Sequence, residues 1–206
     1  KALFAEHPTD HSNRPADLRV TIRDLGPYLE KLFLRAFVDG LHDPEARPSA
    51  LEWEKALVRT WDLLQPCAGA DCPERFFVLH DPSDPRCPFC GTRVPEDRVL
   101  HLRRMCRVRG KRGQWMETGR LNVYDGLPLF PWHFHARIFP DEKAQDRTVQ
   151  AYLSRQSGAW YLVNNSSDCL YDGAGQQIPQ GRTMPLVPGA LFGTWTEDEG
   201  ILWTGI

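Results

Sequence analysis

Apolar residues recur at three- and four-residue steps in the first part of the chain, which is the spacing of an amphipathic helix. They are Leu18, Ile22, Leu25, Leu29, Leu32, Phe33 and Phe37. Gly26-Pro27 interrupts the series, and Pro27 suits the first position of a helix, where its missing N–H costs no hydrogen bond. The spacing predicts a helix that begins at Pro27 and ends near Asp39, because Gly40 is a stop signal.

A second helix is expected directly after Arg47-Pro48. Ser49 as N-cap and Glu52 three residues later form a capping box, in which each side chain accepts a hydrogen bond from the other residue's backbone N–H. Its apolar positions are Trp53, Leu57, Trp61 and Leu64. We expect two antiparallel helices that pack through these two apolar stripes.

The last part of the chain alternates apolar and polar residues in short runs, with turn residues every eight to twelve positions. The turn pairs include Asp125-Gly126, Ser157-Gly158 and Asp172-Gly173. Many short strands at this spacing are typical of a sandwich or a barrel. We therefore expect an antiparallel β-sandwich over residues 98–206.

Four thiols lie between the helical and the β-rich parts, in two pairs. They are Cys67 and Cys72 in a C-x4-C pair, and Cys87 and Cys90 in a C-P-F-C pair followed by Gly91. Tight turns of this kind hold two thiolates on one side, and four thiolates form a closed tetrahedral site with no open position for catalysis. The pattern predicts a zinc ribbon with one structural Zn²⁺. Disulfide or redox use, and replacement of Cys72 by His80, are the alternatives.

The charge of the chain is uneven. The whole chain of 206 residues has a net charge of −2, but residues 98–120 hold eight Lys or Arg against one acid. No run of eighteen apolar residues occurs, so no membrane span is expected, and thiols grouped in two pairs favour a reducing cytoplasm. The sequence begins with Lys1 rather than Met, so both a fragment and a whole chain are open expectations. The expected fold is α+β, with a helical segment over 1–66, a zinc ribbon over 67–97 and the sandwich over 98–206.

The basic segment suggests a partner. Arg103, Arg104 and Arg107 alternate with apolar residues and are candidate contacts for an acidic protein or, with Trp115, for nucleic acid. The alternative is a solvated hairpin whose charges keep an edge strand from pairing wrongly. Nucleic acid is the less favoured partner, because the net charge of the whole chain gives no attraction to it.

No set of catalytic residues is complete, so an enzyme is not expected. His133-x-His135 would place two imidazoles on one face of a strand, but no third metal ligand is evident, which favours a structural role.

Two stretches resemble the end of the C-terminal lobe of eukaryotic-type Ser/Thr protein kinases: Leu32-Phe-Leu-Arg-Ala-Phe-Val-Asp-Gly40 and Arg47-Pro-Ser-Ala-x-x-Trp53. In that family the Arg pairs with the Glu of an A-P-E motif. Arg47 takes its place here, but the A-P-E, H-R-D and D-F-G motifs, the Gly-rich loop and the V-A-I-K lysine are absent, so phosphoryl transfer is not expected.

The order of kinase tail, zinc ribbon and β-rich region is similar to the C-terminal region of bacterial kinases encoded with tellurite-resistance (ter) stress genes. A von Willebrand A-type protein and a PP2C-type phosphatase accompany those kinases.

Residues 149–192 resemble the second half of a forkhead-associated (FHA) domain, which binds phosphothreonine through Arg, Ser and Asn side chains on loops. The matching segments are Val149-Gln-Ala-Tyr-Leu153, Trp160-Tyr-Leu-Val-Asn-Asn-Ser166 and Leu186-Val-Pro-Gly-Ala-Leu-Phe192. By position, the candidate partner-binding residues are Asn164, Asn165, Ser166, Arg147 and Thr148. Phe139-Pro-Asp-Glu142 replaces the family's Gly-Arg, and its acids would repel a phosphate.

These resemblances imply a non-catalytic interaction module of a stress-response kinase that docks a von Willebrand A-type protein or the kinase's substrate. The von Willebrand A fold captures a carboxylate of its partner through a metal ion at its MIDAS site. In this chain, Asp141-Glu142 or Thr196-Glu-Asp-Glu199 could supply that carboxylate. The alternatives are a phosphothreonine-peptide reader of FHA type and nucleic-acid binding through residues 98–115.

Overall fold

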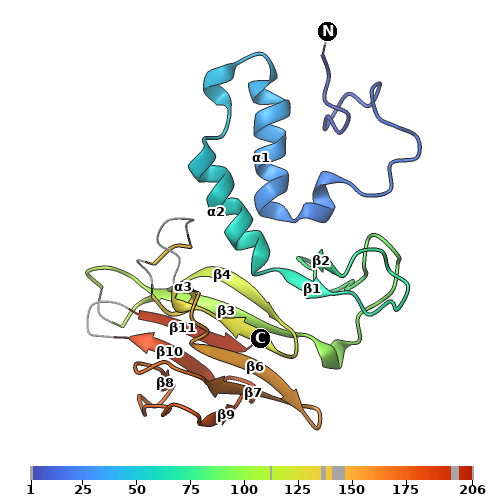
Figure 1. Cartoon of the computed structure of the whole chain (residues 1–206). Coiled ribbons are helices and arrows are strands. Elements are labelled where there is room, and N and C mark those ends of the chain that lie inside the picture. The colour runs from blue at the N-terminus through green and yellow to red at the C-terminus, as the bar shows by residue number, and fades with distance from the viewer. Residues whose placement is uncertain (1, 112, 136–137, 141–146, 196–199, 206) are drawn as a thin grey trace. The chain divides into compact units, whose positions relative to one another are not determined.

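The computed structural model describes residues 2–111, 113–135, 138–140, 147–195 and 200–205. The chain forms two compact units, Lys1–Pro95 and Glu96–Ile206. The described residues contain few helices and several antiparallel sheets, so the fold belongs to the α+β class (Figure 1).

The helices of the first unit are η1 (Ile22–Leu25), α1 (Pro27–Phe37), η2 (Asp39–Leu41), η3 (Pro44–Ala46) and α2 (Ala50–Trp61). α1 begins at Pro27, as predicted, and ends two residues before the predicted limit. The predicted capping box is present at the start of α2: Ser49 Oγ accepts the Glu52 N–H, and the Glu52 carboxylate accepts the Ser49 N–H at 2.8 Å. Local sequence signals therefore set both helix starts.

The two long helices pack through a small apolar core. Leu29 and Leu32 of α1 are buried with Ala56 of α2, and Phe33 meets Trp53 edge-on with 5.2 Å between the ring centroids. Edge-to-face contact is a favourable geometry for two aromatic rings. The contact joins residues that lie twenty positions apart in the chain.

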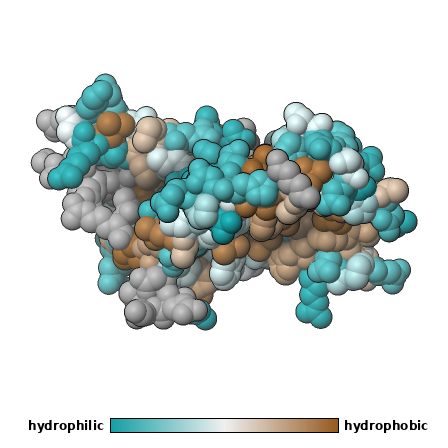
Figure 2. All heavy atoms as spheres, turned by 90° about the horizontal axis from the view of Figure 1, so that it is seen from above, coloured by the Kyte–Doolittle hydropathy of each residue, from teal (hydrophilic) through white to brown (hydrophobic). Residues whose placement is uncertain are grey.

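The stripe predicted for α2 is wrong in its second half. Leu57 and Trp61 are 55% and 64% exposed, whereas Ala56 and Thr60 are buried. Each residue of a helix is turned about 100° from the one before it. Burial of Ala56 therefore turns Leu57 and Trp61 away from the packed face. Figure 2 shows that hydrophobic residues (brown) lie among the hydrophilic ones (teal) on the surface of the chain.

A two-stranded antiparallel sheet follows α2. It pairs β1 (Leu64–Pro66) with β2 (Phe76–Val78), so that Leu64 lies opposite Val78. Gln65 of β1 and Phe77 of β2 lie opposite each other and are both buried. This sheet brings the first cysteine pair to the end of β1.

The second unit contains two antiparallel sheets. Its elements are η4 (Glu96–Arg98), β3 (Leu100–Arg107), β4 (Trp115–Val123), β5 (Leu127–Leu129), α3 (Pro131–Phe134), β6 (Ala151–Gln156), β7 (Ala159–Asn164), β8 (Tyr171–Asp172), β9 (Thr183–Pro185), β10 (Leu191–Trp195) and β11 (Gly200–Gly205). One sheet has the strand order β4-β3-β11-β10-β8 and the other β5-β6-β7-β9. Both sheets supply residues to one buried core, which is compatible with the predicted β-sandwich.

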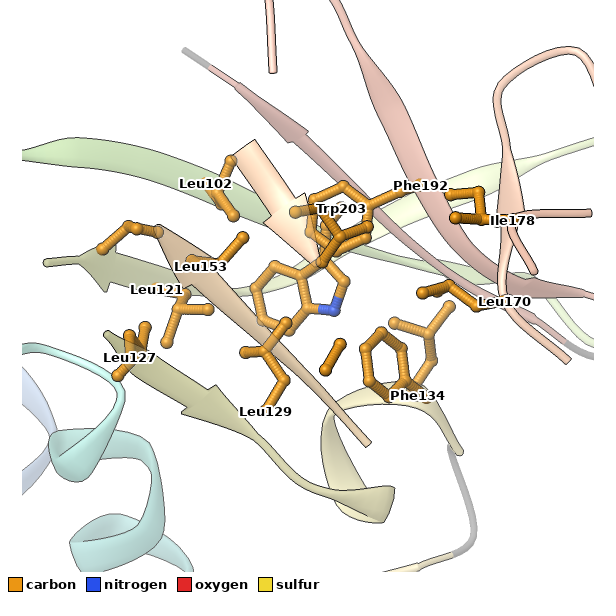
Figure 3. Packing of buried hydrophobic residues seen from close by; sticks show 14 residues of the cluster. Leu102, Leu121, Leu127, Leu129, Phe134, Leu153, Leu170, Ile178, Phe192 and Trp203 are labelled. Atoms are coloured by element: carbon orange, nitrogen blue, oxygen red, sulfur yellow. The ribbon is translucent and has the colours of Figure 1, made fainter. Parts of the chain in front are cut away.

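Trp203 lies in the middle of this core. Its side chain is fully buried, and Figure 3 shows it surrounded by Leu121, Leu129 and Phe134. The indole N–H donates to the backbone oxygen of His133 at 2.9 Å, which satisfies its buried polar group. This bond ties β11 to the short helix α3.

Candidate metal centre

Four cysteine sulfurs meet in the first unit. The Sγ atoms of Cys67, Cys72, Cys87 and Cys90 all lie within 4.8 Å of one another. The Cys67–Cys90 distance is 3.5 Å and the Cys72–Cys87 distance is 3.7 Å. Tetrahedral zinc with Zn–S bonds of about 2.3 Å separates its sulfurs by about 3.8 Å. The cluster therefore fits a single metal ion.

The first pair is placed by β1 and by a turn. Cys67 directly follows β1, and its N–H donates to the Arg75 oxygen at 2.9 Å. The Gly69 N–H donates to Cys67 Sγ at 3.3 Å, and the Cys72 N–H donates to the Gly69 oxygen at 3.3 Å. These two hydrogen bonds form a turn that brings Cys67 and Cys72 together despite their four-residue separation.

Gly69 also allows the two pairs to approach each other. A Cβ at this position would lie 2.9 Å from Thr92 Oγ1 and 3.1 Å from Cys90 Sγ. The predictions from sequence did not include Gly69 or Thr92 in the site. The sequence did contain a signal for Gly69: a glycine between two paired cysteines often marks a place where another part of the chain comes close to the backbone.

The second pair lies on a hairpin turn. The Cys87 N–H donates to the Thr92 oxygen at 3.0 Å, and the Gly91 N–H donates to the Cys87 oxygen at 2.8 Å. Gly91 has a φ of +73°, a conformation that favours glycine, so the chain turns away after Cys90 as predicted. A bridge between Arg86 and Arg93 closes the hairpin.

The four thiols differ in their surroundings. Burial raises the pKa of Cys67 to about 12 and also raises the pKa of Cys72. Hydrogen bonds from the Thr92 side chain and backbone lower the pKa of Cys90 to about 6. Metal binding requires thiolates, so a bound cation must displace the protons of Cys67 and Cys72 at neutral pH.

Other predicted ligands do not join this cluster. His80 is exposed, and among the described residues only the four cysteines form a group able to hold a metal ion. The alternative in which His80 replaces Cys72 is therefore wrong. His133 is buried, and its Nδ1 accepts the Phe130 N–H at 2.9 Å, which agrees with a structural role.

Asn164 cannot contact a partner, so this prediction is wrong. The residue is fully buried, and its Nδ2 donates to the backbone oxygens of Ser167 and Ile178 at 2.8 and 2.7 Å. Its Oδ1 accepts the Ser167 N–H at 2.9 Å. A buried amide needs such partners, and these bonds hold the loop after β7.

The neighbouring candidates lie closer to the surface. Asn165 Nδ2 and Ser166 Oγ both donate to the Val149 oxygen, at 2.8 and 2.9 Å, so their donors hold the segment before β6. Arg147 and Thr148 are exposed. The acidic candidates Asp141-Glu142 and Thr196-Glu-Asp-Glu199 lie outside the described residues.

Of the three candidate arginines, Arg103 and Arg107 share one face of β3, and Arg104 lies on the other. Arg103 is exposed, whereas Arg104 is half-buried and its Nη2 donates to the Trp132 oxygen at 3.4 Å. The Arg107 guanidinium lies over the Trp115 ring, 5.7 Å from its centroid. Neighbouring residues of a strand point to opposite faces, which separates Arg103 from Arg104.

No helix among the described residues has the length and apolar character needed to cross a membrane. Comparison of the chain with models of protein families, with curated proteins and with solved structures gives no significant match. The kinase and FHA resemblances therefore stay predictions, and the cysteine cluster is the site with the most direct geometric support.

Proposed function

We propose that this chain is a non-catalytic protein-interaction module in which one structural Zn²⁺ holds the cysteine segment in shape. The four clustered sulfurs carry this proposal, because they supply a complete tetrahedral set. A metal with four thiolate ligands has no position left for a water molecule or a substrate. The zinc contributes folding free energy to a segment that has few buried apolar residues of its own.

The finer architecture is a zinc ribbon followed by an FHA-like sandwich. The two hairpin-like turns that present the cysteines support the ribbon. The two antiparallel sheets around one core support the sandwich. The module thus combines a metal-bound segment and a folded β domain in one chain, and each of them offers a surface to a protein partner.

The partner that the resemblance implies is a von Willebrand A-type protein of a bacterial stress response, with the kinase's own substrate or a PP2C-type phosphatase as further partners in the cytoplasm. The test is a pull-down at low salt from the native host with the tagged, zinc-loaded chain as bait. We expect a von Willebrand A-type protein to co-purify with the chain but not with a Cys72→Ser/Cys87→Ser variant. Absence of such a protein from both samples would overturn this choice of partner.

A phosphothreonine reader is the weaker candidate, because the side-chain donors of Asn165 and Ser166 already bind Val149. Exposed Arg147 and Thr148 are the observation in its favour. Titration with phosphothreonine peptides and their unphosphorylated forms tests it. Saturable binding of the phosphorylated form alone would support it.

A further inference from the structure

The outer face of the five-stranded sheet carries a row of polar and basic residues. Arg103 of β3 lies directly opposite Arg120 of β4 on one side and Thr204 of β11 on the other. Leu102 and Trp203, the neighbours of Arg103 and Thr204 in their strands, are buried in the core, so the row faces away from it. Two like charges directly opposite each other destabilise a strand pair. Glu117 already pairs with Arg120, and a bound anionic group at Arg103 would offset the rest of that cost.

Next to this row lies an apolar one. Met105 is opposite Leu202, Leu202 is opposite Gly193, and Gly193 is opposite Tyr171. The Met105, Leu202 and Tyr171 side chains are partly exposed. Gly193 adds no side chain to the row: its φ is +158°, and a Cβ there would lie 1.9 Å from the Ile201 oxygen. Tyr, Met and Arg are enriched at protein interfaces.

Basic residues outnumber acidic ones on this face. Glu117, the one acid of residues 98–120, pairs with Arg120 at 3.3 Å, whereas Arg103 has no ion pair among the described residues. The stacking of Arg107 on Trp115 adds a positioned cation at the end of the same strand pair. The rest of the chain is acidic in sum, so the attraction is local to this face.

We propose that this surface, the arginine face, is a docking site for an acidic protein segment that also carries apolar side chains. The arginine face consists of Arg103, Met105, Arg107, Trp115, Arg120 and Leu202. Carboxylates of the segment bind the guanidinium groups, and its apolar side chains cover Met105 and Leu202. This inference rests on the proposed interaction function and names the surface and its chemistry.

A protein segment fits the arginine face better than nucleic acid does. Phosphodiester groups make no favourable contact with the apolar row of Met105 and Leu202, whereas apolar side chains of a protein segment would cover it. A segment in which Asp or Glu alternates with apolar residues can bind the arginines through its carboxylates and cover Met105 and Leu202 with its apolar side chains. Bidentate Arg–carboxylate bonds supply directional contacts in such a complex.

The test uses the full, zinc-loaded chain and a fluorescein-labelled synthetic peptide of Glu residues with interspersed Leu, followed by fluorescence anisotropy. We expect Arg103→Glu to weaken binding by about tenfold, which corresponds to about 1.4 kcal/mol. Arg103→Gln should give a smaller loss. Arg182→Glu is the matched control, because it makes the same charge change at an exposed position beside β9 of the other sheet.

Thermal unfolding of each variant separates lost binding from lost folding, and only variants that unfold like the parent are compared. Equal weakening by Arg103→Glu and Arg182→Glu would overturn the proposal, since it would reflect net charge alone. Tighter binding of a mixed-sequence DNA duplex than of the peptide, with loss in Arg103→Glu, would also overturn it in favour of nucleic acid. A peptide with Lys in place of Glu should not bind.

The outcomes distinguish the surface from the proposed partner. If Arg103→Glu leaves von Willebrand A-type protein bound in the pull-down, the arginine face is wrong and the interaction function stands. If that protein never co-purifies but peptide binding depends on Arg103, the named partner is wrong and the surface stands.

Discussion

The four clustered cysteines differ in burial: Cys87 is 1% exposed, whereas Cys90 is an exposed residue. Because the neighbours of a buried side chain are closely packed, they cannot move to replace the thiol when it is substituted. Substitution of Cys87 is therefore the most direct test of the proposed metal centre.

Replacement of Cys87 by Ser should reduce the zinc content from about one ion per chain to less than half, because a hydroxyl is a much poorer ligand for zinc than a thiolate. Mass spectrometry of elements in the purified protein measures the ratio. Cys169→Ser is the matched control, since Cys169 lies outside the cluster, in the second unit, and this variant should keep its zinc. A full zinc complement in Cys87→Ser would contradict the four-thiolate centre.

At the scale of elements, the start of α2 combines a helix cap with a link to α1. The Glu52 carboxylate accepts hydrogen bonds from Arg35 Nη2 at 3.0 Å and from the Ser49 N–H at 2.8 Å. Arg35 and, after it, Ser49 lower the pKa of Glu52 from 4.5 to about 2. Since Arg35 belongs to α1, one carboxylate both caps a helix and joins it to its neighbour.

This pKa predicts a pH-dependent stability. A carboxyl whose pKa is lower in the folded chain stabilises it above pH 4.5, and this stabilisation is lost as the pH falls from 4.5 towards 2. The difference in free energy of unfolding between the parent and Glu52→Gln should therefore be constant above about pH 5 and shrink below it.

Urea unfolding at a series of pH values, followed by helical circular dichroism, measures that difference. Acid also releases zinc, but it does so from the parent and the variant alike, so the subtraction removes this effect. Glu54→Gln on the same helix is the control, because Glu54 has no ion pair among the described residues, and its difference should vary much less with pH. A flat difference for Glu52→Gln between pH 5 and 2 would contradict the lowered pKa.

At the scale of the whole molecule, the two units are stabilised in different ways. The second unit has a core to which both sheets contribute, including fully buried Trp203 and Phe192. The cysteine segment of the first unit buries few apolar side chains, such as Leu79 and Val94. The proposed zinc ion should therefore stabilise mainly the segment around the cysteines.

Removal of zinc with a strong chelator should unfold the cysteine segment and leave the β-rich unit folded. Amide hydrogen exchange of the full chain, with and without chelator, should show lost protection over residues 64–95 and retained protection in β6, β7 and β11. Equal loss of protection in both units would show that the metal stabilises the whole chain, which would contradict this division.

Short-range signals predicted much of the fold. Pro27, the Ser49–Glu52 box and Gly91 act through their own backbone or through residues a few positions away, so the sequence indicates their role directly. The four cysteines were predicted to meet, and they do. Errors arose where a residue's role depends on distant neighbours, as for Leu57 and Asn164.

The sequence by itself determined where helices begin, which cysteines come together and that the last part of the chain alternates into strands. The tertiary structure alone decided which side of α2 is buried and which residues of β4 share a face. In β4, Thr118 is an extra residue between the pairs Arg104–Gly119 and Met105–Glu117, and this bulge changes which residues share a face. Packing against other elements determines such faces, and a pattern read along one strand contains no information about its neighbours.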